Sequence, residues 1–126
     1  IQHKALLARD ADNLGKIAEL GKIALDNEDY ETAKECFDLM IEKTNYPSDK
    51  FNAINNNLKI AIETKQTDVD IRFKEVFDEY GINKLTFRTQ IAYANYLTFT
   101  KNNPEEAVKI LEKAMTFASS RFTKAI

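Results

Sequence analysis

The sequence predicts an all-α fold built from antiparallel pairs of helices. Apolar residues recur every three or four positions along most of the chain, which is the spacing of one face of an α-helix. Only 3 Gly and 2 Pro occur in 126 residues, too few for the many turns of an all-β protein. With 44% apolar and 10% aromatic residues, the chain has enough apolar surface to bury a core.

Six helices are predicted in order, at residues 4–26, 30–44, 48–66, 67–80, 83–102 and 103–118. The first is one long helix or two joined ones, and Gly15 and Gly21 weaken it slightly. The polar turn at residues 26–29 separates it from the second helix. Pro47 is expected to end the second helix, and Ser48 can cap the third.

The last three helices carry clearer start and stop signals. Thr67 and Asp70 match the spacing of a capping box, and Gly81 suits the left-handed conformation that ends many helices. Asn83 can cap the fifth helix. The sixth helix has the clearest start, with an N-cap residue, a first-turn proline and a capping-box carboxylate at Asn103, Pro104 and Glu106.

A common frame links the helix pairs. In the first pair it reads Ile17-x-x-Leu20-Gly21-x-x-Ala24, followed twelve residues after Gly21 by Ala33-x-x-x-Phe37-x-x-Met40. The third pair repeats it as Ile91-x-x-Ala94-Asn95-x-x-Thr98, then Ala107-x-x-x-Leu111-x-x-Ala114. The middle pair is degenerate, with Asn57-x-x-Ile60-Ala61-x-x-Thr64 before Phe73-x-x-x-Phe77-x-x-Tyr80.

This pattern resembles the tetratricopeptide repeat, in which Leu-Gly on the first helix and Ala-x-x-x-Phe on the second allow close helix packing. The residues that match directly are Leu20, Gly21, Ala33 and Phe37. The chain departs from the family in having no aromatic residue at Ile17 and Ile91, and a bulky one at Phe73. Half-a-tetratricopeptide repeats and an unrelated helical bundle remain open as alternatives.

The resemblance implies a short α-solenoid, a superhelical stack of antiparallel helix-turn-helix repeats. Residues 1–126 would form a single domain with repeats at about 14–47, 54–87 and 88–121, after an N-terminal helical extension at 1–13. Phe73 and Ala107 lie 34 residues apart, the family period, whereas Ala33 and Phe73 lie 40 apart. We assign the excess of six to an insertion around residues 46–50.

The C-terminal end is expected to be unfinished. Ser119 and Ser120 are predicted to break the sixth helix, and residues 121–126, with Phe122, can open a seventh that stops before two turns. A repeat array buries its faces through its neighbours, so this array would continue or meet another chain. The side chains then left partly bare, which can promote a homo-oligomer, are Leu111, Met115 and Phe117.

In the family, the first helices of successive repeats line a concave groove that binds peptides. The resemblance places groove residues in the first repeat at Gly15, Ala18, Lys22 and Leu25. Those of the second and third repeats are Asn55, Leu58, Ile62 and Lys65, then Thr89, Ala92, Tyr93, Tyr96 and Phe99. Tyr96 and Phe99 would anchor a peptide, unless a neighbouring helix buries them. The chaperone-binding clamp of the family is broken, because its places hold Ala18, Lys22, Lys59, Thr89 and Tyr93.

No catalytic, metal-binding or cofactor-binding set is evident in the sequence. His3 is the only histidine and lies near a chain end, and Cys36 is the only cysteine. Neither a phosphate-binding glycine loop nor a calcium-loop spacing occurs. Residues 55–57 are three asparagines, of which at most two can share one helix face, and a solvated surface explains them. We expect a protein that is not an enzyme and has no cofactor.

The charge balance excludes several partners. With 18 basic and 20 acidic residues the net charge is −2, which does not favour nucleic acid or an anionic membrane surface. No apolar run is long enough for membrane insertion, so we expect a soluble chain. A cytoplasmic location is slightly favoured, and a periplasmic or secreted one stays open. A start at Ile1 indicates an excerpt of a longer chain.

Three functions are compatible with this sequence. The first is a scaffold that binds a peptide or partner helix in the groove. The second is an architectural or self-associating repeat segment, and the third is a regulatory appendage of an enzyme outside this chain. The residues do not identify the partner protein or the pathway.

Overall fold

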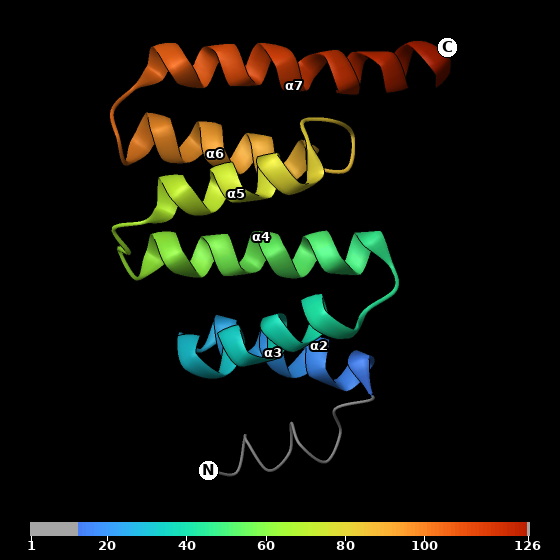
Figure 1. The fold of residues 1–126 in the computed structure, drawn as a ribbon, viewed down its shortest axis with the longest axis vertical. Coiled ribbons are helices and arrows are strands. Elements are labelled where there is room, and N and C mark those ends of the chain that lie inside the picture. Colours follow the sequence, from blue (N-terminus) through green and yellow to red (C-terminus); the bar gives the residue numbers. More distant parts are fainter. Residues whose placement is uncertain (1–12, 126) are drawn as a thin grey trace. The chain divides into compact units, whose positions relative to one another are not determined.

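The computed structural model describes residues 13–125, and their side chains as far as residue 117. Six helices make up this part of the chain, and it contains no strand (Figure 1). They are α2 (Leu14–Asp26), α3 (Tyr30–Lys43), α4 (Pro47–Glu63), α5 (Val69–Tyr80), α6 (Phe87–Phe99) and α7 (Pro104–Ala125). The predicted all-α class is confirmed, whereas the portion of the first predicted helix before residue 13 lies outside the described residues.

The helices group into two compact units that divide after Lys65. In the first unit, α2 and α3 form an antiparallel pair and α4 packs against α3. In the second unit, α6 and α7 form the closest pair, and aromatic rings join α5 to α6. The first and third of the predicted helix pairs are therefore found, one in each unit.

Small residues set the close approach of α2 and α3. Gly21 is buried, and a Cβ atom added to it would lie only 3.0 Å from the Cβ atom of Cys36 and 3.0 Å from a ring carbon of Phe37. Ala33 is fully buried in the same core, with Ala24 nearby in the cluster. The small residues of the first repeat frame thus lie where the two helices touch.

The α6–α7 pair uses the same device. Ala94 and Ala107 are buried together with Leu97, and Ile110 and Leu111 pack against them from α7. Ala107 holds the position on α7 that Ala33 holds on α3. The packing role predicted for the frame is therefore found in the first and third pairs.

The turns that follow α2, α4 and α6 share one backbone feature. Glu28, Lys65 and Asn102 all have a positive φ, at 59°, 56° and 53°, and successive members lie 37 residues apart. The amide of Glu28 donates to the carbonyl of Leu25, and the amide of Lys65 donates to that of Ile62, both at 3.0 Å. A recurring left-handed residue thus follows α2, α4 and α6.

Two predicted helix limits are wrong. Pro47 is the first residue of α4, not a stop for α3, which ends at Lys43. Proline suits this place because the first helical residues need no backbone N–H donor. At the other end of the chain, α7 continues through Ser119 and Ser120 to Ala125, because the low helix propensity of two serines is a weak effect.

The predicted caps give a mixed result. Asn103 caps α7, with its Oδ1 accepting from the amide of Glu106 at 3.4 Å, and Gly81 ends α5 with φ 82°. The capping box at Thr67 is wrong, because Asp68 precedes the first residue of α5 and makes no side-chain cap. Asn83 does not cap α6, which begins at Phe87. It organises the preceding loop, accepting from the amide of Leu85 at 2.9 Å.

Candidate peptide-binding groove

The first unit contains a groove of about 520 Å³ between α2 and α4, with α3 as its floor. The lining residues are Ala18, Glu19, Lys22, Leu25, Asp26, Phe37, Met40, Asp49, Asn52, Ala53, Asn56 and Lys59. Helices α2 and α4 each pack antiparallel to α3, so they run in the same direction (Figure 1). The groove therefore has two distinct ends, one at the start of both helices and one near their C-terminal turns.

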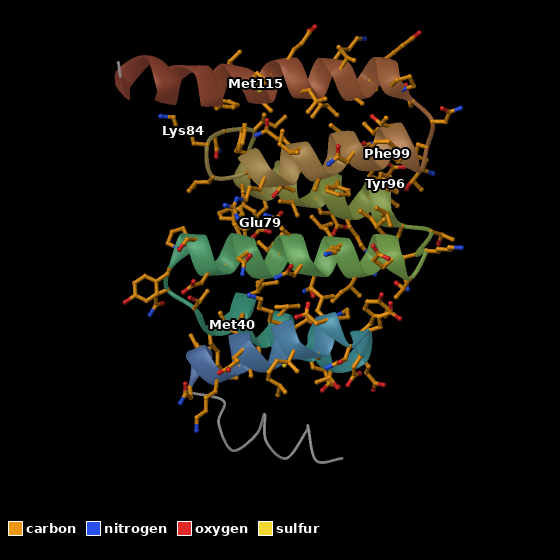
Figure 2. The ribbon with its side chains drawn as sticks, turned by 180° about the vertical axis from the view of Figure 1, so that it is seen from behind. Met40, Glu79, Lys84, Tyr96, Phe99 and Met115 are labelled. Atoms are coloured by element: carbon orange, nitrogen blue, oxygen red, sulfur yellow. The ribbon has the colours of Figure 1, made fainter. Side chains whose placement is uncertain are left out.

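The floor of the groove is apolar and rigidly packed. Phe37 and Met40 of α3 and Ala53 of α4 are buried in the core, and each presents part of its surface to the groove. Met40 lies on the last turns of α3, close to α4 (Figure 2). Half-buried Ala18 and Leu25 of α2 complete the apolar surface. Such a surface can bury an apolar side chain of a ligand.

The walls of the groove are polar and carry no internal partners. Lys22 is exposed on α2, and Asn52, Asn56 and Lys59 follow at helical spacing on α4. Within the described residues, the side chains of these four make no hydrogen bond or ion pair. Amide and ammonium groups in that state can bind the backbone or charged groups of a ligand at no cost in internal contacts.

Three of the residues predicted for the first repeat lie in this groove. Ala18, Lys22 and Leu25 line it, since residues at spacings of three and four share one helix face. Gly15 is exposed on α2 and does not line it.

The residues predicted for the second repeat lie outside this groove. Leu58 is 4% exposed and belongs to the core, Ile62 is half-buried, and Lys65 lies in the turn after α4. Asn55 does not line the groove either. The structure brings none of these four to the site.

The α4 residues that do line the groove were missed, although the sequence holds a signal for them. Asn52, Asn56 and Lys59 lie 34 residues after Ala18, Lys22 and Leu25 respectively. The family period therefore relates α2 to α4 directly. On this register the six extra residues fall between Lys59 and Phe73, at the end of the long helix α4 and in the turn before α5.

The third-repeat residues lie in the second unit, where an aromatic cluster joins α5 to α6. The ring of Phe73 lies 4.8 Å from that of Tyr93 and 5.9 Å from that of Tyr96, centre to centre. Phe73 is fully buried and Tyr96 is 6% exposed, so both are core residues. The hydroxyl of Tyr93 donates to the carboxylate of Asp70 at 3.3 Å.

The remaining third-repeat residues have diverse surroundings. Thr89 is buried and Ala92 is half-buried, whereas Phe99 at the end of α6 is 83% exposed (Figure 2). Of the two predicted aromatic anchors, Phe99 is accessible to a ligand and Tyr96 is packed within its own unit. The alternative in which a neighbouring helix buries the aromatic residue therefore holds for Tyr96.

Burial raises the pKa values of two side chains near these sites, Cys36 in the first unit and Tyr93 in the second. It raises the pKa of the Cys36 thiol to about 11, with the carboxylates of Glu35 and Asp29 adding to the shift. It also raises the pKa of Tyr93 to about 12, and Asp70 adds to that shift. At neutral pH Cys36 is thus a protonated packing residue rather than a nucleophilic thiolate.

The described residues contain no group of three or more His, Cys, Asp or Glu side chains placed to hold a metal ion. None of the helices in that part of the chain has the length and apolar character needed to cross a membrane.

Comparisons of the chain with protein-family models, with curated protein sequences and with solved structures find no match. The site combines an open groove, an apolar floor and polar walls whose Lys22, Asn52, Asn56 and Lys59 side chains have no partner within the described residues.

Proposed function

We propose that this chain is a non-catalytic protein-interaction scaffold of the tetratricopeptide-like class, which binds a peptide or a helix of a partner protein in the α2–α4 groove. The observation that carries the proposal is the groove itself, with a volume of about 520 Å³ and polar side chains free along both walls. Clefts of this size with an apolar floor and a few convergent polar groups are typical ligand sites.

The repeat geometry supports the family part of this proposal. The lining residues of α2 and α4 follow the 34-residue family period, and Gly21 and Ala33 occupy the close helix contact for which the family uses small residues. The recurring left-handed residue after α2, α4 and α6 adds a backbone feature with regular spacing. A stacked superhelix is the arrangement that these features favour.

Binding would combine two contributions. An apolar ligand side chain that covers half-buried Ala18 and Leu25 removes apolar surface from water, at roughly 25 cal/mol per Å². Asn52 and Asn56 can each donate to and accept from a peptide group of the ligand. The lining includes no histidine, cysteine, serine or threonine, so it offers no hydroxyl or thiol nucleophile paired with a histidine base.

This function can be tested with a variant whose larger side chains fill the groove. Replacing both Asn52 and Asn56 with Arg places two long side chains across it, while Asn95→Arg makes the same change at an exposed site on α6. Proteins captured by the parent chain from the source lysate should also bind Asn95→Arg and should not bind the double variant. Equal melting temperatures establish that the fold is retained. A partner set unaffected by the double variant excludes the groove as the binding site.

A second candidate function is self-association through α7. Val108 and Met115 are 50% and 53% exposed and lie seven residues apart on one face, with half-buried Leu111 between them. Phe117 is half-buried, and the side chain of Phe122 lies outside the described residues. Exposed apolar stripes of this kind favour contact between chains.

Sedimentation over a wide concentration range tests this second candidate. We expect the parent to form dimers and Met115→Lys to remain monomeric, with Lys109→Glu as a control for a change of charge on the same helix. A parent that is monomeric at every concentration contradicts self-association.

A further inference from the structure

The charged residues of the α2–α4 groove are unevenly distributed along its length. Asp49 lies in the first turn of α4, and Lys59 lies ten residues later, in the same lining face. At 1.5 Å per residue the two positions are about 15 Å apart along the helix. Because α2 and α4 run in the same direction, Asp49 marks the end of the groove at which both helices begin.

The charged lining residues of α2 follow nearly the same order along the groove as those of α4. Glu19 lies in the half of the groove nearer Asp49, while Lys22 lies one turn further towards Lys59. Asp26 at the end of α2 is the exception to this order. One half of the groove therefore has two carboxylates, and the other half has two ammonium groups and one carboxylate.

None of these five charged side chains has an ion pair or hydrogen bond within the described part of the chain, so their charges act on whatever occupies the groove. All five are exposed at the walls, while the floor between them is buried and apolar. A ligand in this groove therefore meets negative charge at one end, apolar surface in the middle and an excess of positive charge at the other end.

We propose that the groove binds an extended peptide segment with a basic residue, an apolar residue and an acidic residue at alternate positions, oriented with its basic end at Asp49 and its acidic end at Lys59. Side chains at positions i, i+2 and i+4 of an extended segment point to the same side. Four steps of about 3.3 Å span about 13 Å, which matches the separation of the two charged ends. This inference rests on the proposed function and adds the class and the orientation of the ligand.

The first experiment measures selectivity by titrating the isotope-labelled full chain with blocked pentapeptides and following backbone amide shifts by NMR. The probes are acetyl-Arg-Ser-Leu-Ser-Asp-amide, the same peptide with Arg at both ends, the same with Asp at both ends, and the mixed peptide with Ser in place of Leu. Exposed charge pairs contribute up to about 1 kcal/mol each, so the mixed peptide should bind about threefold to tenfold more tightly than either uniformly charged one. That advantage should shrink at 0.5 M salt, and loss of Leu should abolish binding.

The second experiment measures orientation, with a nitroxide label on the Arg end of the mixed peptide. In the parent chain the label should broaden amides near Asp49 more than those near Lys59. The double variant Asp49→Lys, Lys59→Asp keeps the net charge and inverts the order of charges, so the broadening should move to the opposite end while the affinity stays within about twofold. If the new Lys in the first turn of α4 disturbs that helix, Glu19→Lys reverses a charge away from a helix end and should reduce the orientation preference.

The outcomes separate the two proposals. Groove amides that shift equally with all Leu-containing peptides, or broadening that does not depend on the charge swap, overturn this inference and leave the groove as a peptide site. A chain in which none of the peptides shifts an amide of α2 or α4, and whose lysate partners are unaffected by the Asn52→Arg, Asn56→Arg variant, overturns both. Selectivity for the mixed peptide with inverted orientation in the swap variant supports both.

Discussion

The two compact units use one packing device and differ in what covers the adjoining face. In the first unit, Ala18 and Ala53 are small, and the space beside them is open with polar walls. In the second, Phe73, Tyr93 and Tyr96 bring three rings together between α5 and α6. The small residues of the frame determine how closely two helices approach. The side chains outside the frame determine whether the face beside them is open to a ligand.

This comparison is most strongly tested at the aromatic cluster. Phe73 is fully buried, so Phe73→Ala should lower the free energy of unfolding by about 3–5 kcal/mol, because it removes apolar contacts and leaves a cavity. Phe99→Ala is the matched control, since Phe99 is exposed and its loss should change stability by less than about 0.5 kcal/mol. Urea unfolding of the two variants measures both values. Equal destabilisation would contradict a core role for one ring and a surface role for the other.

The packing device itself gives the next largest effect. Ala33→Leu and Ala107→Leu should each destabilise the chain by about 1–3 kcal/mol, because both alanines are buried at the contact between paired helices. Ala18→Leu adds the same side chain to a half-buried groove position and should cost less. Thermal melts monitored by circular dichroism compare the three. Unchanged melting temperatures for Ala33→Leu and Ala107→Leu would contradict the common frame.

The smallest expected effect is a loss of folding stability at alkaline pH, which begins at a different pH in each unit. The pKa of Cys36 is raised from 9.0 to about 11 in the folded chain, so its contribution to stability is complete below pH 9 and is lost as the pH rises towards 11. The pKa of Tyr93 is raised from 10.0 to about 12, so its contribution is lost at higher pH. We expect the free energy of unfolding to fall by about 1–2 kcal/mol between pH 9 and 11 through Cys36.

Denaturant unfolding at several alkaline pH values measures that loss. Cys36→Ala should flatten the decline that begins at pH 9, whereas Tyr93→Phe should leave the decline between pH 9 and 10 in place and flatten the part between pH 10 and 12. A decline that is identical in the parent and in Cys36→Ala would show that another group controls it.

The groove on α2 could be predicted because its register was fixed by Leu20 and Gly21, whose packing role is local. The α4 side of the groove could not be predicted, because the repeat frame on α4 is counted back from Phe73 on α5. Six extra residues separate that helix from α4, and no glycine or proline in the sequence marks the end of α4 at Glu63. A register error of six residues rotates a helix face by about 120°, which turned the prediction towards the core at Leu58.

The fold class and most helix positions were predictable for a different reason. Apolar periodicity reports which face of a helix is buried, and for α3, α4, α5 and α6 it gave both limits within about four residues. A helix limit was predicted wrongly where one residue type can either end a helix or begin one. Pro47 can end one helix or begin the next, and the sequence around it does not distinguish these roles.

Site-specific photo-crosslinking tests the central claim, that the α2–α4 groove binds a partner protein, most directly. p-Benzoylphenylalanine in place of Asn56 puts the reactive group in the groove, and the same residue in place of Asn95 puts it on an exposed face of α6. Irradiation in the source lysate should give a discrete crosslinked protein with the probe at position 56 and none with the probe at position 95. No adduct at position 56, or the same adducts at both positions, would contradict the account.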